Sequence, residues 1–307
     1  MHHKYGLSTT PAYKDGIVFA TFGNELYAFD ADIRDKKDEG IRDEPQGRDR
    51  HDILWKAELK GSICRSSPLF YREMVLLNTV AGVEFYPVRP KKGSGTGRIK
   101  IYETGGTLSA GMAHNGSILV AASRSGHVAY DLKTDRKLWT AGAGLGSSPC
   151  IDGGFVYFAD AAGRLQCVRI ADGKPAWKSE SRFRVGTYAS PSTDKGIVYA
   201  TGGQDGTLHA VDGRTGKTVW TFEVPAEDEL KRGVKAGYGR SVYCKPLVCD
   251  GKIYFTSYSG YLYCVKEGRL LWKERISESI CMTIPMAYKG AIYVRGKGAT
   301  YKFGSRR

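Results

Sequence analysis

The chain has 307 residues, 41% of them hydrophobic, and its formal net charge at pH 7 is +14. This length and apolar content allow a packed core, and no apolar run approaches the ~20 residues of a membrane span, so a transmembrane helix is excluded. The excess of basic residues fits an anionic partner, such as nucleic acid, acidic polysaccharide or lipid head groups, and equally a merely soluble basic surface.

Short strands separated by tight turns are predicted for the first half of the chain. The runs are rich in β-branched and aromatic residues, and Gly, Asn or Asp follows many of them. The predicted strands are 16–20, 25–30, 54–55, 74–77, 83–86, 117–120, 127–130, 137–139, 155–158 and 165–168. Residues 31–52 interrupt this order with many Arg, Lys, Asp and Glu, which indicates a charged surface insertion.

The second half shows the pattern most clearly between residues 196 and 220. Two strands, 196–200 and 208–212, are separated by a turn at Gly206, and a turn at Gly216 leads to a third strand at 218. Glycine suits both turns because it accepts positive φ without a Cβ clash. A second charged insertion is predicted at 225–240. The strands that follow are 252–255, 261–264, 270–272, 291–294 and 299–303.

All five tryptophans of the chain fall at one position of a repeat, at the start of its last strand. They are Trp55, Trp139, Trp177, Trp220 and Trp272, and the last four are separated by 38, 43 and 52 residues. A period of roughly 40 residues with about four strands per unit is typical of a β-propeller blade. We therefore predict that the tryptophans are structural and dock each blade on its neighbour.

Elements containing proline precede the first strand of most units, at Pro11, Pro68, Pro149, Pro191, Pro246 and Pro285, and a variant without proline stands at 109–111. These elements count seven blades. The sequence thus predicts an all-β, seven-bladed β-propeller of four-stranded antiparallel blades, as a single domain over residues 1–307. The last blade lacks a Trp-bearing strand, so we expect residues 3–6 of the N-terminal segment to close it, with a three-stranded last blade as the alternative.

Residues 210–220, with Ala-Val-Asp and Thr-Gly before the final Trp, resemble the repeat of the quinoprotein-like (PQQ-repeat) β-propeller family. Weaker matches lie at 28–30, 130–134 and 171–177. The fold of that family hosts both dehydrogenases and non-catalytic scaffolds, among them assembly scaffolds of bacterial outer membranes. The resemblance points to the non-catalytic branch. Its dehydrogenases carry adjacent cysteines, a calcium site and usually eight blades, so PQQ, calcium, other cofactors and a catalytic or metal-binding residue are not expected here.

The loops that enter the innermost strands of a propeller converge near its axis, and here they carry Arg and Tyr. Arg suits carboxylate, phosphate or sulfate groups, and Tyr suits the faces of sugars or bases. The candidate ligand-binding residues are Arg65, Arg184, Tyr188, Arg240 and Tyr243. The alternative is that these arginines pair with Asp and Glu of adjacent loops.

Three functions remain open on this sequence. The favoured one is a non-catalytic binding or scaffold propeller, a monomer that presents a basic mouth lined by Tyr and Arg to an anionic ligand or a protein partner. The alternatives are a polysaccharide lyase or hydrolase with its site in the central funnel, and a module that binds polyanions or nucleic acid. The compartment is also open. Seven cysteines and the lack of a signal peptide favour the cytoplasm, and the family resemblance favours the periplasm or the extracellular space.

Overall fold

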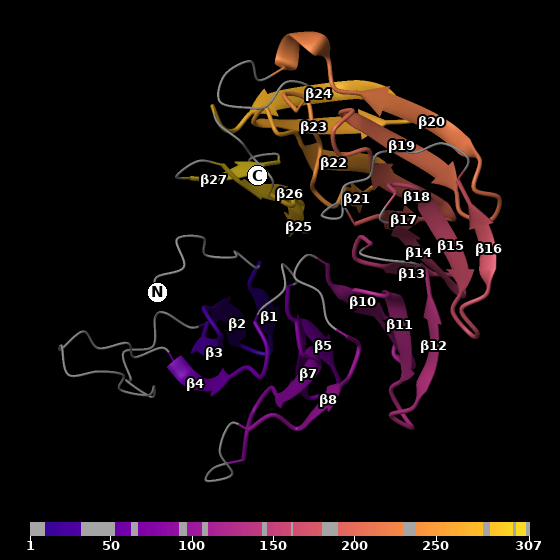
Figure 1. Ribbon diagram of the computed structural model, residues 1–307. Coiled ribbons are helices and arrows are strands. Elements are labelled where there is room, and N and C mark those ends of the chain that lie inside the picture. Colours follow the sequence, from indigo (N-terminus) through magenta and orange to yellow (C-terminus); the bar gives the residue numbers. More distant parts are fainter. Residues whose placement is uncertain are drawn as a thin grey trace. The chain divides into compact units, whose positions relative to one another are not determined.

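The structure is a computed structural model, and it describes residues 10–31, 53–62, 67–91, 97–105, 110–142, 146–160, 162–179, 190–229, 238–278, 283–296 and 299–304. The chain groups into two compact units, Met1–Lys137 and Leu138–Arg307, which are treated in turn (Figure 1). The prediction of one domain spanning residues 1–307 stays a prediction.

The described residues form seven consecutive antiparallel sheets, six with four strands and the last with three. The chain is an all-β, seven-bladed β-propeller, as the sequence predicts. The described part contains one short 3₁₀ helix and no helix that could cross a membrane. Closure by residues 3–6 lies outside the described residues. Below, the sheets are called blades 1 to 7 in chain order.

Unit 1 contains blades 1 and 2 and most of blade 3. Blade 1 consists of β1 Ala12–Lys14, β2 Ile17–Phe22, β3 Glu25–Asp30 and β4 Ile53–Glu58. Blade 2 consists of β5 Leu69–Tyr71, β6 Met74–Thr79, β7 Gly82–Pro87 and β8 Lys100–Tyr102. Blade 3 consists of β9 Met112–His114, β10 Ile118–Ser123, β11 Gly126–Asp131 and β12 Lys137–Ala141, whose first residue is the last of the unit.

Unit 2 contains blades 4 to 7. Blade 4 consists of β13 Cys150–Asp152, β14 Phe155–Ala159, β15 Leu165–Arg169 and β16 Pro175–Lys178. Blade 5 consists of β17 Ser192–Asp194, β18 Ile197–Thr201, β19 Thr207–Asp212 and β20 Thr218–Glu223. The 3₁₀ helix η1 Ala226–Asp228 follows, and then blade 6 with β21 Leu247–Cys249, β22 Lys252–Thr256, β23 Tyr261–Lys266 and β24 Arg269–Arg275. Blade 7 consists of β25 Met286–Tyr288, β26 Ala291–Arg295 and β27 Thr300–Phe303. The innermost strands β13, β17, β21 and β25 neighbour one another in this order.

Two-residue turns join the first two strands of most blades. In blade 5, Asp194 pairs with Ile197, which leaves Lys195 and Gly196 in the turn with φ of 49° and 79°. Positive φ at both central residues is the type I′ conformation, whose twist matches that of the strands it joins. The turns Asp15–Gly16, Gly153–Gly154, Asp250–Gly251 and Lys289–Gly290 show the same pair of positive φ values.

The Asp of the repeat fixes the turn before the Trp-bearing strand. The Asp212 carboxylate accepts hydrogen bonds from the backbone N–H of Arg214 (3.1 Å) and Thr215 (2.7 Å) and from the Thr215 hydroxyl (2.8 Å). These donors favour the ionised carboxylate and lower the pKa of Asp212. Asp131 accepts from two backbone N–H groups in the same way in blade 3. The repeat pattern therefore encodes the turn itself.

The core lies between consecutive blades within each unit. In unit 1, one buried cluster joins blades 1 and 2 and another joins blades 2 and 3. In unit 2, three clusters join blades 4 and 5, 5 and 6, and 6 and 7. Strands with two buried faces, such as Gly82–Pro87, contribute to both neighbours, so each blade is stabilised by the next.

Blade 2 carries a buried carboxylate that holds the loop after β4. Glu84 is 0% exposed and accepts hydrogen bonds from the N–H of Lys60 (3.0 Å) and Gly61 (3.1 Å). The hydroxyls of Thr79 (2.8 Å) and Tyr86 (2.7 Å) also donate to it, and the Arg98 guanidinium lies 3.3 Å away. A buried carboxylate is stable only with such a full set of donors. No sequence motif indicates this network.

Candidate functional site

Two of the five predicted ligand-binding residues lie in the described part of the chain. Arg240 and Tyr243 belong to one loop, residues 238–246, which joins blade 5 to blade 6 in unit 2. Arg65, Arg184 and Tyr188 lie outside the described residues. The structure therefore places Arg240 and Tyr243 close in one segment and leaves the convergence of the other three as a prediction.

Backbone hydrogen bonds fix this loop against turns of both blades. Val242 forms a bridge with Gly203 of blade 5, and its N–H donates to the Gly203 carbonyl at 2.7 Å. The N–H of Tyr258, in the β22–β23 turn of blade 6, donates to the Ser241 carbonyl at 2.7 Å. Because the loop is held on both sides, its side chains project from a defined backbone.

Three tyrosines and a glutamine gather around the loop. The Gln204 side-chain amide donates to the Tyr238 hydroxyl, and the rings of Tyr243 and Tyr258 meet edge to face with centroids 5.8 Å apart. Burial is the main cause that raises the pKa of Tyr243, and the neighbouring Tyr238 and Tyr258 raise it further. All four side chains are partly exposed, so they offer hydroxyl, amide and ring surface to a ligand.

Arg240 belongs to the same loop. Its guanidinium donates to the Val224 carbonyl at 3.4 Å, and no carboxylate within the described ranges forms an ion pair with it. Its backbone crosses close to Gly206, where an added Cβ would lie 2.7 Å from the Arg240 carbonyl oxygen. The loop cluster, defined as Gln204, Tyr238, Arg240, Tyr243 and Tyr258, can thus donate hydrogen bonds to a carboxylate or another anion.

The second predicted insertion, 225–240, is described at both of its ends. At its start, Asp228 in η1 is buried and accepts hydrogen bonds from the Lys273 ammonium (2.7 Å) and the Tyr263 hydroxyl (2.8 Å). The carboxylate raises the pKa of Lys273, and burial followed by the bond to Asp228 raises that of Tyr263. The insertion is therefore anchored on blade 6. Of the first insertion, 31–52, only residue 31 is described.

Each tryptophan contacts the blade that follows its own. The indole N–H of Trp55 donates to the Val88 carbonyl (3.1 Å), that of Trp139 to Ile170 (2.8 Å), and that of Trp177 to Gly213 (2.8 Å). The Trp139 and Trp177 rings also lie on the turn glycines of the next blade.

Trp220 lies near the turn at Gly268, and Trp272 stacks on Phe303 with centroids 5.7 Å apart. These are the contacts that blade docking requires. Their contribution to stability stays a prediction.

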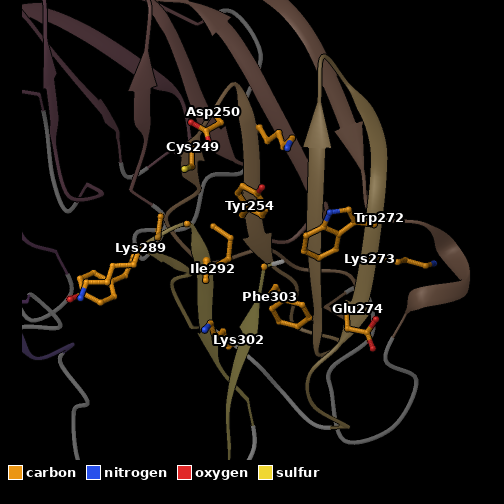
Figure 2. Close-up of a pocket in the computed structure, with 16 residues that line it drawn as sticks. Cys249, Asp250, Tyr254, Trp272, Lys273, Glu274, Lys289, Ile292, Lys302 and Phe303 are labelled. Atoms are coloured by element: carbon orange, nitrogen blue, oxygen red, sulfur yellow. The ribbon is translucent and has the colours of Figure 1, made fainter. Parts of the chain in front are cut away.

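A groove of about 820 Å³ lies between blades 6 and 7 within unit 2 (Figure 2). Tyr254, Trp272, Ile292 and Phe303 supply apolar surface. Charged residues also line it, namely Asp250, Lys252, Lys273, Glu274, Lys289 and Lys302. Sequence reasoning missed this groove, and the signal that could have located it is that the described part of blade 7 has three strands and no tryptophan.

Within the described ranges, no three His, Cys, Asp or Glu side chains are grouped so that they could hold a metal ion. Five of the seven cysteines are described, and all five are free thiols. The expectation that the chain uses neither PQQ nor calcium remains untested.

Comparison with known proteins supports the repeat family. A family model described as outer membrane protein assembly factor BamB matches residues 124–245 and 204–304. A quinohemoprotein alcohol dehydrogenase of Comamonas testosteroni is 25% identical over 154 residues, which are 45% of this chain and 20% of the enzyme. The match therefore spans about a fifth of the length of that relative.

Two solved structures share the fold. BamB from Moraxella catarrhalis aligns with a TM-score of 0.65 and 16% identity, over 96% of this chain and 81% of that one. The computationally designed Ika8 protein aligns with a TM-score of 0.62 and 13% identity, over 98% and 96% of the two chains. At such identities the similarity concerns the fold alone.

Proposed function

The chain belongs to the family of the outer membrane protein assembly factor BamB, and on this premise we propose that it is a non-catalytic scaffold that binds a protein partner. The observation that carries the proposal is the family match over residues 124–304, which includes the whole loop cluster. The dehydrogenase relative adds no support for an enzyme, because only a fifth of its length is matched.

The finer part of the proposal concerns how the partner is held. The loop cluster combines the Arg240 guanidinium, which has no carboxylate partner among the described residues, with the partly exposed rings of Tyr238, Tyr243 and Tyr258. Arg and Tyr are enriched at the energetic centres of protein interfaces. We propose that Arg240 receives an acidic side chain of the partner and that the tyrosines pack around it. The basic net charge of +14 would favour the approach of such a partner.

Site-specific photocrosslinking tests this proposal with the full chain in its native cells. p-Benzoylphenylalanine replaces Tyr243 in the loop cluster in one variant and Val219 in a control variant. Val219 is 53% exposed on β20 of the same unit and lies outside the cluster. The proposal predicts a discrete protein adduct from position 243 that position 219 does not give.

A second variant carries Arg240→Ala together with the probe at position 243. The adduct should become several-fold weaker, because truncating a central Arg removes charge-assisted hydrogen bonds. No protein adduct at position 243, the same adducts at both positions, or an adduct with glycan or nucleic acid alone would each overturn the proposal.

A further inference from the structure

The groove between blades 6 and 7 combines a strand edge with which no other described strand pairs, aromatic side chains, and lysines that form no ion pair with a described carboxylate. We propose that it is a second docking surface, which binds an extended acidic segment of a partner protein by adding that segment to blade 7. In the bound segment, acidic and bulky apolar side chains would alternate. The inference goes beyond the proposed function, since it involves none of the residues of the loop cluster.

The strand edge is the outer edge of β27. Blades 4, 5 and 6 each have a fourth strand, β16, β20 and β24, paired to the third. In blade 7, β27 pairs with β26 and with no other strand of the described ranges. An edge with unpaired N–H and C=O groups is a template for another extended chain, and strand addition is a common mode of peptide recognition.

The aromatic side chains at the groove favour one kind of side chain in the bound segment. The rings of Tyr301 and Phe303 stack on one face of β27 with centroids 6.4 Å apart, and Phe303 stacks on Trp272 of blade 6. Directly opposite residues of paired strands share a face of the sheet. A residue of the segment opposite Phe303 would therefore point toward Trp272, which is 36% exposed, and into the groove of about 820 Å³. A bulky apolar side chain fits there.

The lysines at the groove favour acidic residues on either side of that apolar residue in the bound segment. Lys302 stands between Tyr301 and Phe303, so its side chain lies on the opposite face of β27 (Figure 2). Lys252 and Lys289 also line the groove, and none of these three lysines forms an ion pair with a carboxylate of the described residues. Lys273 is already paired with Asp228. Among the described residues of the lining, Asp250 and Glu274 are the only acidic ones, so these residues together carry a net positive charge, which favours an acidic segment.

The test uses the full chain and a short synthetic peptide in which glutamate alternates with valine around one central phenylalanine. Binding is measured by titration calorimetry. A carbodiimide then couples glutamates of the bound peptide to nearby lysines, which are mapped by mass spectrometry. The inference predicts coupling to Lys302 or Lys289, and about tenfold weaker binding after the double substitution K289E/K302E. K217E is the matched control, an exposed lysine of blade 5 outside the groove, and it should bind like the unaltered chain.

A peptide with lysine in place of every glutamate, or alanine in place of the phenylalanine, should bind at least several-fold more weakly. Absence of binding to the full chain would overturn the inference, even if binding appears once residues 1–9 are removed, since the edge would then belong to the chain's own N-terminal segment. A concentration-dependent dimer coupled through Lys302 would also overturn it. The photocrosslinking at position 243 does not depend on Lys302, so the two proposals can fail separately.

Discussion

Replacing Gly216 with alanine should loosen blade 4 from blade 5. Gly216 lies in the turn before β20 with φ of +75°, and an added Cβ would lie 2.7 Å from the indole ring of Trp177 in the preceding blade. That indole donates its N–H to the Gly213 carbonyl of the same turn at 2.8 Å. The substitution therefore strains the backbone and displaces the ring as well.

Three contributions set the expected loss of stability. A non-glycine residue in the left-handed region costs roughly 1–2 kcal/mol. The hydrogen bond from the indole is worth about 1 kcal/mol, and displacing the ring adds some packing loss. We expect Gly216→Ala to lower the free energy of unfolding by about 2–4 kcal/mol.

Gly196→Ala is the matched control, because Gly196 lies in the same blade with φ of +79° and has no atom within 4 Å of an added Cβ. It should cost only the backbone strain, about 1–2 kcal/mol. Urea unfolding of the full chain, followed by circular dichroism, measures both variants. Equal losses in the two variants would refute the claim that the turn glycine serves the contact with Trp177. So would an equal cost of Gly216→Ala in a Trp177→Leu background.

Three further predictions concern buried polar groups. Burial lowers the pKa of His209 from 6.5 to about 4, so the unfolded chain takes up a proton first on acidification. The contribution of His209 to the free energy of unfolding should be fully present above pH 6.5 and should fall by at most about 3 kcal/mol toward pH 4. In urea unfolding measured at a series of pH values, His209→Gln should make the midpoint depend less on pH in this range, and an unaltered dependence would contradict the prediction. Glu84→Gln should lower the free energy of unfolding by about 3 kcal/mol in the same urea assay, because the buried donors around Glu84 lose a charged acceptor. The control Glu73→Gln, at the exposed ion pair with Lys14, should change it little. Asp228→Asn should lower the free energy of unfolding by about 2 kcal/mol, because it weakens the bond to Lys273. It should also increase amide hydrogen exchange in residues 225–229, and unchanged exchange there would argue against the anchoring of this insertion on blade 6 by Asp228.

The sequence predicted the blades well because the repeat encodes its own turns. The Asp212 carboxylate caps the turn at Gly216, and Trp177 lies on that same glycine, so a pattern visible in the sequence has a direct physical cause. It did not predict the register shift that accompanies the Trp-bearing strand, as between Cys264 and Val265 opposite Trp272. Such a bulge places one extra residue in one strand of the pair, and the alternation of apolar residues along a strand does not show where it falls.

The candidate site was predicted only in part. Arg240 and Tyr243 stood out because they lie in one loop before an innermost strand. Gln204 and Tyr258 joined them only in the structure, since they come from turns of two different blades that bracket that loop. The groove beside Trp272 was missed for a similar reason. It lies beside blade 7, whose described part has three strands, and a repeat pattern does not show what surface remains next to a blade with fewer strands.

The most direct test of the proposed scaffold function is amide hydrogen exchange of the full chain, alone and in the complex isolated with its crosslinked protein partner. We predict slower exchange on binding in two of the segments that carry the loop cluster, residues 202–206 and 238–246. Unchanged exchange in both segments, with protection elsewhere or nowhere, would contradict it.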